Sequence, residues 1–300
     1  MKTALLVGLL CVCLTPALAG EAGDPFSDDP AEPLAVSEKS GSGQGTATLH
    51  EISFATVEGP MMQGDLLVPS GKGPFPAILY VHWLGDPETS NRTQFRQEAE
   101  RMAERGVVGL LVDMPWSRPH WFRERKLVDD YDFSRRQVKN LRRALDVLTQ
   151  RPEVDRKRIA YVGHDFGATY GSILLGVDSR INCAVLMAGT PILSDWFLLG
   201  SKIEGKSREA YMKKMAPLDP VNYVGKAKGV PILFQFATHD EYVAKDKAEL
   251  FANSASAPKE LRWYDAGHEM NAQAAADRVS WLEARLKLQK SKNGQLHSRK

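Results

Sequence analysis

The sequence predicts an α/β fold in which a mostly parallel central sheet of about eight strands has helices on both faces. Short apolar segments alternate with amphipathic ones from residue 47 to residue 288. Continuous apolar strands are typical of sheets that are buried on both faces. Polar residues able to carry chemistry follow directly after three of these segments, at the strand ends where such sheets bind ligands.

Bulk composition agrees with one large domain. The chain has 300 residues, 43% of them hydrophobic, and a formal net charge of +2. Such a length can bury a sizeable core. The near-neutral charge does not suggest a nucleic-acid partner, so we expect a small-molecule substrate. Cys183 is the one cysteine of the predicted domain, which excludes an intramolecular disulfide there and favours a small buried hydrophobe.

Residues 1–19 predict a secretory signal peptide. Lys2 precedes an apolar run, and Ala17 and Ala19 form an Ala-x-Ala site for cleavage before Gly20. The alternative is a membrane anchor, but the apolar run is short for a hydrocarbon core of about 30 Å. We therefore expect a secreted or periplasmic protein with no stable membrane anchor after cleavage.

The two ends of the mature chain differ in composition from its centre. Residues 20–46 are rich in Gly, Ser, Pro and acidic residues, and they predict a flexible leader. Residues 289–300 predict a basic, disordered tail. Between them we expect a single α/β domain over residues 47–288.

In the first half of the domain, apolar and amphipathic segments alternate in order. Residues 50–56 and 61–70 predict two antiparallel strands, and residues 75–83 predict a buried strand. Residues 93–106 form an amphipathic helical pattern closed by Gly106, and residues 107–115 are the next apolar strand. Residues 132–152 then predict a long helix with these apolar positions on one face: Val138, Leu141, Ala144, Leu145 and Leu148.

The second half continues the alternation. Residues 158–164 predict a strand that runs into a helix over residues 166–177. Three further apolar segments predict strands, over residues 181–189, 230–238 and 260–267. Amphipathic helices are expected after the last two, over residues 244–255 and 274–288.

Three residues at strand ends form a candidate catalytic constellation. Asp165 follows the strand at 158–164, Asp240 the strand at 230–238, and His268 the strand at 260–267. The chain order is nucleophile, acid and histidine, with spacings of 75 residues (240 − 165) and 28 residues (268 − 240). Gly163 and Gly167 flank Asp165 as a tight strand-to-helix turn requires, and the helix N-terminus favours an anion. The histidine would act as base and the acid would orient it.

Each of these residues also has a simpler interpretation. Asp165 and Asp240 could each cap a helix. Asp265 lies near His268 and could compete as its partner, although its place on the strand predicts that it turns away. The three residues together, in order and at successive strand ends, favour a hydrolase.

Residues 48–287 resemble the α/β-hydrolase superfamily and are similar to secreted dienelactone-hydrolase-like and prolyl-oligopeptidase-like members, with an aspartate at the nucleophile elbow. The resemblance rests on "FPAILYVHW", "VDRKRIAYVGHDFGATYG", "APLDPVNYV", "FATHDEYV" and "WYDAGHEM". It implies an oxyanion hole formed by the backbone N–H groups of Phe166 and Trp83. The family usually has His-Gly where this chain has His82 and Trp83. His82 and His164 are expected to be structural.

An aspartate at the elbow changes the expected chemistry. An ionised carboxylate needs no base to activate it, and it attacks saturated carbon to form an alkyl ester. Water activated by His268 would then hydrolyse that ester. "GHDFG" resembles the Gly-His-Asp-Trp-Gly elbow of epoxide hydrolases and of haloalkane or haloacid dehalogenases. Phe166 lacks the indole N–H that dehalogenases offer to the halide.

Other aromatic residues are candidates for the missing donors. The tryptophans that could replace the indole are Trp83, Trp116, Trp121 and Trp196. Epoxide hydrolases use two lid tyrosines, and the short insert before the strand at 230–238 contains Tyr211 and Tyr223. The candidates for lining the substrate pocket are His82, Trp116, Trp196 and Tyr211.

Three functional hypotheses follow. The first is an exported hydrolase that acts on a small organic substrate through Asp165, Asp240 and His268. The second is a dehalogenase or epoxide hydrolase specifically. The third is a catalytically silent fold that binds a ligand or partner. The sequence shows no metal motif and no nucleotide fingerprint, so no cofactor is implied.

Overall fold

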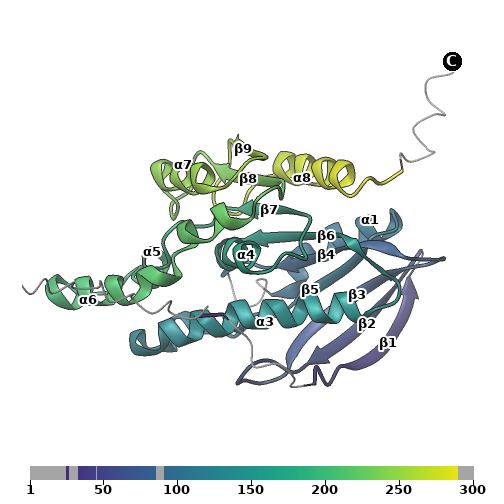
Figure 1. Cartoon of the computed structure of the whole chain (residues 1–300), viewed down its shortest axis with the longest axis horizontal. Coiled ribbons are helices and arrows are strands. Elements are labelled where there is room, and N and C mark those ends of the chain that lie inside the picture. Colours follow the sequence, from purple (N-terminus) through teal and green to yellow (C-terminus); the bar gives the residue numbers. More distant parts are fainter. Residues whose placement is uncertain (1–24, 27–32, 45, 86–90, 290–300) are drawn as a thin grey trace, which may run out of the picture.

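A nine-stranded sheet forms the centre of the molecule (Figure 1). The structure is a computed structural model that describes residues 25–26, 33–44, 46–85 and 91–289. The predicted signal peptide and nearly all of the predicted tail lie outside these ranges. The order of the strands across the sheet is β1-β2-β3-β5-β4-β6-β7-β8-β9. Their bounds are β1 Ser37–Gln44, β2 Ala47–Phe54, β3 Met62–Pro69, β4 Phe75–Val81, β5 Val108–Val112, β6 Val154–His164, β7 Cys183–Met187, β8 Ile232–Ala237 and β9 Lys259–Tyr264.

The sheet is mixed, and most of it is parallel. Strands β1, β2, β3 and β5 pair antiparallel, whereas the pairs from β5 through β4 to β9 are parallel. In β4, Leu79 and Val81 face one hydrophobic layer while Ile78 and Tyr80 face the other, as the two-residue period of a strand requires. Both faces of the strand are therefore buried. The predicted α/β class is confirmed.

Helices cover the two faces of the sheet. The α-helices are α1 Arg96–Glu104, α2 Trp121–Glu124, α3 Asp130–Gln150, α4 Phe166–Val177, α5 Leu193–Phe197, α6 Gly205–Met215, α7 Lys245–Ser254 and α8 Ala272–Arg285. Helices α1 and α8 contribute to one hydrophobic layer, and α3, α4 and α7 contribute to the other. Figure 1 shows α6 projecting away from the sheet, beyond α5. No helix in the described part of the chain is long and apolar enough to cross a membrane.

The prediction of a flexible leader was wrong for residues 37–44. These residues form β1, an edge strand paired antiparallel with β2. Glu38 on β1 lies 2.8 Å from both His50 and Arg151. An edge strand is held mainly by backbone pairing, so β1 needs no run of apolar residues and carries no apolar signal. Phe26 is also buried, with its ring edge-on to Tyr223 at 5.4 Å.

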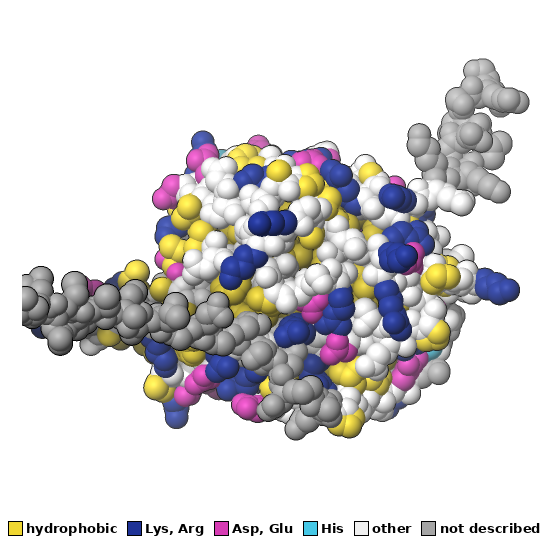
Figure 2. Space-filling view, viewed as in Figure 1, with side chains coloured by type: hydrophobic (Ala, Val, Ile, Leu, Met, Phe, Trp, Pro, Cys, Tyr) yellow, Lys and Arg dark blue, Asp and Glu magenta, His cyan; other side chains and the backbone are white. Residues whose placement is uncertain are grey.

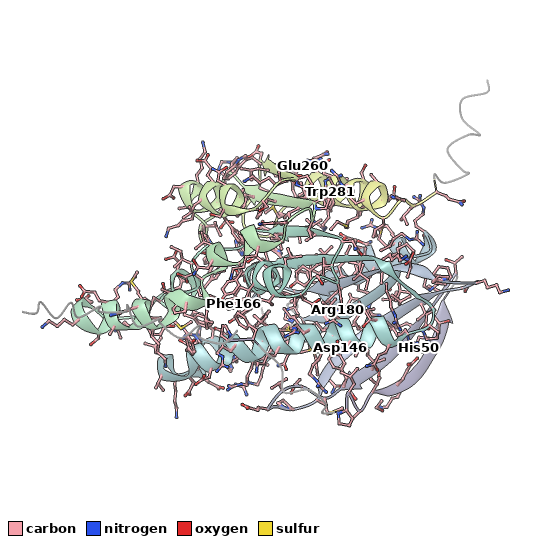
Figure 3. All side chains as sticks on the ribbon, viewed as in Figure 1. His50, Asp146, Phe166, Arg180, Glu260 and Trp281 are labelled. Atoms are coloured by element: carbon pink, nitrogen blue, oxygen red, sulfur yellow. The ribbon has the colours of Figure 1, made fainter. Side chains whose placement is uncertain are left out.

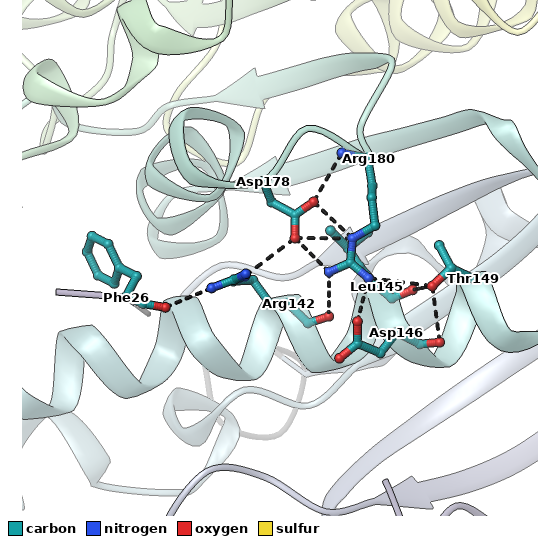
Figure 4. Close-up of polar contacts among 7 residues, drawn as sticks. All are labelled: Phe26, Arg142, Leu145, Asp146, Thr149, Asp178 and Arg180. Carbon is teal, nitrogen blue, oxygen red and sulfur yellow. Dashed lines mark hydrogen bonds and ion pairs between the residues drawn. The ribbon is translucent and has the colours of Figure 1, made fainter. Parts of the chain in front are cut away.

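A polar network fixes the C-terminal end of α4 against α3 (Figure 4). Asp178 ends α4, and its Oδ2 accepts a hydrogen bond from Nη2 of Arg180 at 2.6 Å. Arg180 also pairs with Asp146 on α3. Arg142, also on α3, lies 3.5 Å from Asp178 and donates to the Phe26 carbonyl at 2.8 Å. Charged hydrogen bonds of this kind are geometrically specific, so the network fixes the helix that starts at Asp165.

In the turn between β6 and α4, backbone segments lie so close together that no side chain fits between them. A Cβ atom on Gly163 would lie 2.5 Å from the carbonyl carbon of Gly167. A Cβ atom on Gly167 would overlap the carbonyl oxygen of Val81 on β4. Both glycines are therefore required by close backbone approach, as the sequence pattern predicts.

The surface carries mixed charge. On the face shown in Figure 2, Lys and Arg side chains are spread over the elements and are interspersed with Asp and Glu. This distribution agrees with the small net charge of +2.

Gly167→Ala is expected to destabilise the fold by about 3 kcal/mol or more, because its new methyl group meets backbone that cannot rotate away. Gly59→Ala is the matched control, since Gly59 is exposed and an added Cβ would meet only the Thr56 side chain within 3.0 Å. That variant should stay within about 0.5 kcal/mol of the parent. Chemical denaturation of both variants measures the difference, and equal stability would contradict the crowding at the turn.

Candidate active site

Asp165 occupies a strained turn between β6 and α4. Its backbone has φ 56° and ψ −113°, a conformation that residues other than glycine rarely adopt. The Asp165 N–H donates to the Met187 carbonyl at 2.9 Å, and its carbonyl accepts hydrogen bonds from Thr169. The turn thus places the carboxylate at the start of α4, where the positive end of the helix favours an anion. Figure 3 labels the next residue, Phe166, at this end of α4.

The two carboxylate oxygens of Asp165 have different environments. Oδ2 accepts a hydrogen bond of 2.8 Å from the Leu84 N–H, and the Phe166 N–H also favours the ionised carboxylate. Oδ1 is buried and has no hydrogen-bond partner among the described residues. Burial raises the pKa of Asp165 to about 7, although the charge of His268 and these hydrogen bonds oppose the rise. One oxygen is therefore held in place while the other is left free.

His268 and Asp240 lie together as the sequence predicts. Nδ1 of His268 is 3.0 Å and 2.9 Å from the two carboxylate oxygens of Asp240. Burial alone would raise the pKa of Asp240, but its bond to His268 and the Tyr242 and Val243 N–H groups hold that pKa below its usual value. Burial opposes the charged form of His268, yet the Asp240 hydrogen bond and the Asp165 charge raise its pKa. The pair is a histidine oriented by an ionised acid.

The competing acid turns away from this pair. Asp265 is exposed and lies 2.8 Å from His239, which is exposed as well. Asp240 therefore remains the partner of His268, and it also accepts backbone hydrogen bonds at the start of the following loop.

The second backbone donor facing the elbow is Leu84, one residue beyond the predicted Trp83. The Trp83 N–H donates instead to Oε1 of Gln94 at 2.9 Å, which occupies it. In this loop the Trp83 N–H faces Gln94 and the Leu84 N–H faces Asp165. The structure places Phe166 and Leu84, rather than Phe166 and Trp83, around the carboxylate.

A cavity of about 820 Å³ opens above Asp165 and His268. Its aromatic wall comes from helices α2, α4 and α5 and from two loops, and it includes Trp83, Trp121, Phe122, Phe166, Trp196 and Tyr242. Charged side chains of both signs also line the cavity, namely Arg118, Arg123, Glu241 and Glu269. The volume suits a small organic molecule with apolar contacts near the reacting atoms.

Three of the four predicted pocket residues are not among the described residues that line this cavity, whereas Trp196 is. His82 is buried, bonds the Trp83 carbonyl and accepts from the Met114 N–H, and burial lowers its pKa to about 4. The Trp116 indole donates to the His82 carbonyl. The Tyr211 hydroxyl donates to Asp130.

Two of the candidate tryptophan donors are already used inside the fold. Trp116 donates to the backbone, and the Trp196 indole donates to Thr169 at 3.1 Å. Trp83 and Trp121 line the cavity, and their indole N–H groups have no acceptor within the ranges that the structure describes. The second tyrosine of the insert, Tyr223, donates to the Pro217 carbonyl, so neither predicted lid tyrosine has a free hydroxyl.

Several residues of the site were not predicted from the sequence. Leu84, Gln94 and Tyr242 carried no motif of their own. Tyr242 stands two residues after Asp240, and its ring lies 5.0 Å from the His268 ring. Its position two residues after Asp240 was the feature of the sequence that could have predicted its place in the site.

The parallel sheet, the elbow and the acid–histidine pair at neighbouring strand ends define an α/β-hydrolase. The family described as esterase FrsA-like matches residues 35–222, and the chain belongs to this family. The description PhoPQ-activated pathogenicity-related protein matches residues 201–295. The assignment to a subgroup, similar to prolyl-oligopeptidase-like or dienelactone-hydrolase-like members, stays a prediction.

Individual relatives are distant. The chain is 24% identical to esterase FrsA of Escherichia fergusonii over 270 residues, which cover 80% of this chain and 60% of that protein. It thus spans less than two thirds of the curated relative. Among solved structures, acetyl xylan esterase from Paenibacillus sp. R4 has a TM-score of 0.73 at 19% identity, covering 84% of this chain and 89% of that one. A prolyl endopeptidase has a TM-score of 0.62 at 16% identity, and the match covers 81% of this chain and 39% of that one. These structures share the fold.

Asp165→Asn is expected to stabilise the fold at pH 8 and to have little effect at pH 4. The pKa of Asp165 in the fold, about 7, exceeds its usual value of 3.8, so ionisation favours the unfolded chain progressively as pH rises from about 4 to 7. The variant removes this penalty, which is on the order of 1–4 kcal/mol above pH 7. Denaturation curves at the two pH values measure it. A stability difference that does not change with pH would contradict a buried carboxylate with a raised pKa.

Proposed function

We propose that this protein is a hydrolase in which Asp165 forms a covalent ester with a small organic substrate and His268, oriented by Asp240, activates the water that releases it. The observation that carries the proposal is the unequal environment of the two Asp165 oxygens. Oδ2 accepts from the Leu84 N–H at 2.8 Å, while Oδ1 is buried without a partner. A carboxylate oxygen without a hydrogen-bond partner, on a residue that lines the cavity, is a suitable nucleophile.

The first step is displacement at a saturated carbon. Oδ1 of Asp165 forms a bond to that carbon while the bond to the leaving group breaks, and the electron pair departs with the leaving group. The indole N–H groups of Trp83 and Trp121 are available in the cavity to stabilise an electronegative leaving group. Halogenated acids and alkyl halides fit this chemistry directly, and an epoxide fits it when its ring oxygen, which stays attached to the substrate, takes a proton from water.

The second step hydrolyses the aspartyl ester. His268 takes a proton from water, and the resulting hydroxide attacks Cγ of Asp165. Negative charge develops on Oδ2, to which the Leu84 N–H already donates, and the Phe166 N–H also favours a charged Asp165. The intermediate collapses with cleavage of the bond between Cγ and the substrate-linked oxygen, and the proton on His268 passes to the departing alcohol. This leaves Asp165 as a carboxylic acid, which releases its proton to solvent and so restores the free enzyme.

Carboxylic esters are a second candidate substrate class, favoured by the match to the FrsA-like esterase family. Attack on an ester carbonyl would form an acid anhydride and would need donors for the substrate oxygen. Oδ2 of Asp165 already uses the Leu84 N–H. We therefore consider carboxylic esters a less favoured substrate class than compounds that alkylate Asp165.

A catalytically silent binding protein is the least supported of the three hypotheses. Asp240 and His268 are paired at 2.9 Å, and Asp165 and His268 line the same cavity. No ion pair to Asp165 is present among the residues that the structure describes. A binding protein has no need of this arrangement.

We also propose, on the sequence of residues 1–19, that the enzyme is exported and acts outside the cytoplasm.

Replacing His268 with Gln should trap the covalent ester, because the water is no longer activated. The variant is incubated with halogenated acids, alkyl halides, epoxides and esters. Mass spectrometry of the tryptic peptide 159–180 then locates the adduct, and Asp178 in the same peptide is an internal control. We expect one alkyl group on Asp165 and none on Asp178. Ester turnover that persists in Asp165→Asn, without any adduct, would contradict the proposal.

The rate of enzyme alkylation should rise with pH and level off above about pH 7. Below that value Asp165 is protonated in the fold and is a poor nucleophile, since burial raises its pKa to about 7. The wild-type kcat/KM for a substrate that does not titrate between pH 5 and 9 measures this dependence. A flat profile, or a midpoint near 4, would show that a different group controls the reaction.

A further inference from the structure

His164, the residue before Asp165, is a buried polar group that the proposed reaction does not use. It is 1% exposed and does not belong to the described lining of the catalytic cavity. It nevertheless contacts Gln94, which holds the Trp83 N–H, and the loop that carries His268. Its Nδ1 lies 2.7 Å from Nε2 of Gln94, and its Nε2 lies 2.9 Å from the backbone carbonyl of His268.

The direction of every hydrogen bond in this chain of contacts can be deduced. The Trp83 N–H is a backbone donor and can only donate, so Gln94 must present its oxygen to it at 2.9 Å. The amide nitrogen of Gln94 then donates to Nδ1 of His164. With Nδ1 an acceptor, the proton of a neutral His164 is on Nε2, where it donates to the His268 carbonyl.

The surroundings of His164 keep it neutral. Burial, and then repulsion from His268, hold the pKa of His164 well below its usual value. The ring stacks on Trp83 at 5.0 Å and on His268 at 5.3 Å, each measured between ring centroids. A neutral ring between these two residues satisfies both hydrogen bonds without bringing a second positive charge to the site.

We propose that Gln94 and His164 are positioning residues. They hold the Trp83–Leu84 loop and the His268 loop in fixed positions relative to Asp165. The inference rests on the proposed role of Asp165 and adds to it. Leu84 follows Trp83 directly, so holding the Trp83 N–H also sets the direction of the Leu84 N–H that bonds Oδ2. At the other end, His164 holds the backbone of His268. The same chain of bonds therefore aligns the donor and the base.

Gln94→Met tests this role, because methionine has a similar length, is only a weak acceptor for the Trp83 N–H and cannot donate to His164. We expect kcat to fall about 10- to 100-fold, the effect of misplacing reacting groups by about 1 Å. KM should stay near the wild-type value, since Gln94 does not line the described catalytic cavity. Gln97→Met is the matched control, because Gln97 is exposed nearby on α1.

Nitrogen NMR of protein with labelled histidines provides a readout that needs no substrate. In the wild type, His164 should be a neutral ring protonated at Nε2, with Nδ1 bare. In Gln94→Met, the Nδ1–H signal of His268, which arises from its bond to Asp240, should shift or broaden, whereas Gln97→Met leaves it unchanged. A wild-type His164 protonated at Nδ1, or an unchanged His268 signal in Gln94→Met, would overturn the proposal.

Gln94→Glu covers the case in which Gln94→Met does not fold. A carboxylate accepts from the Trp83 N–H but cannot donate to Nδ1, so His164 should take up a second proton and show the signals of an imidazolium. Carbon NMR of the new carboxyl shows whether it is ionised, and a neutral His164 beside an ionised carboxylate at pH 7 would overturn the inferred contact. If His268→Gln forms no Asp165 adduct, the proposed function fails, while the histidine signals still decide whether the two positioning residues act as described.

Discussion

The hydrogen bond from the Leu84 N–H to Oδ2 of Asp165 is the contact on which the chemistry of the site depends. In a serine elbow, the backbone donors remain available for the carbonyl oxygen of the substrate. Here the nucleophile supplies the oxygen that they hold. In the reaction that we propose, charge stabilisation is thereby directed to Cγ of Asp165 in an enzyme-bound ester, and away from a carbonyl of the substrate. Replacing a hydroxyl by a carboxylate in an otherwise ordinary elbow thus changes which bond the site is suited to break.

That contact depends on backbone crowding elsewhere. Helix α4 passes close enough to β4 and β6 that Gly163 and Gly167 have no room for a side chain. The turn between them holds Asp165 at φ 56°, and the Asp178–Arg180 network fixes the far end of α4. The strain and the desolvation of a carboxylate whose pKa is raised to about 7 destabilise the fold locally, as is usual where function requires a buried charge.

The sequence predicted the parts of this protein that follow from periodicity and backbone sterics. The α/β class, the long helix α3 and the elbow glycines all appear where expected. It did not predict β1, because an edge strand has no apolar pattern to reveal it. It placed the second donor at Trp83, one residue from Leu84, because side-chain patterns do not encode the direction of an N–H in an irregular loop. The pocket roles of His82, Trp116 and Tyr211 failed because tertiary contacts use their polar atoms inside the fold.

Following the oxygen of water tests the central claim most directly. Wild-type enzyme is allowed many turnovers, in water labelled with heavy oxygen, on a substrate that alkylates Asp165. Because the ester is cleaved at Cγ, the label should enter the Asp165 carboxylate and leave Asp178 of the same peptide unlabelled, and the product of a single turnover should carry unlabelled oxygen. Label that appears only in the product, already in the first turnover and never in Asp165, would show that water attacks the substrate directly and would contradict the account.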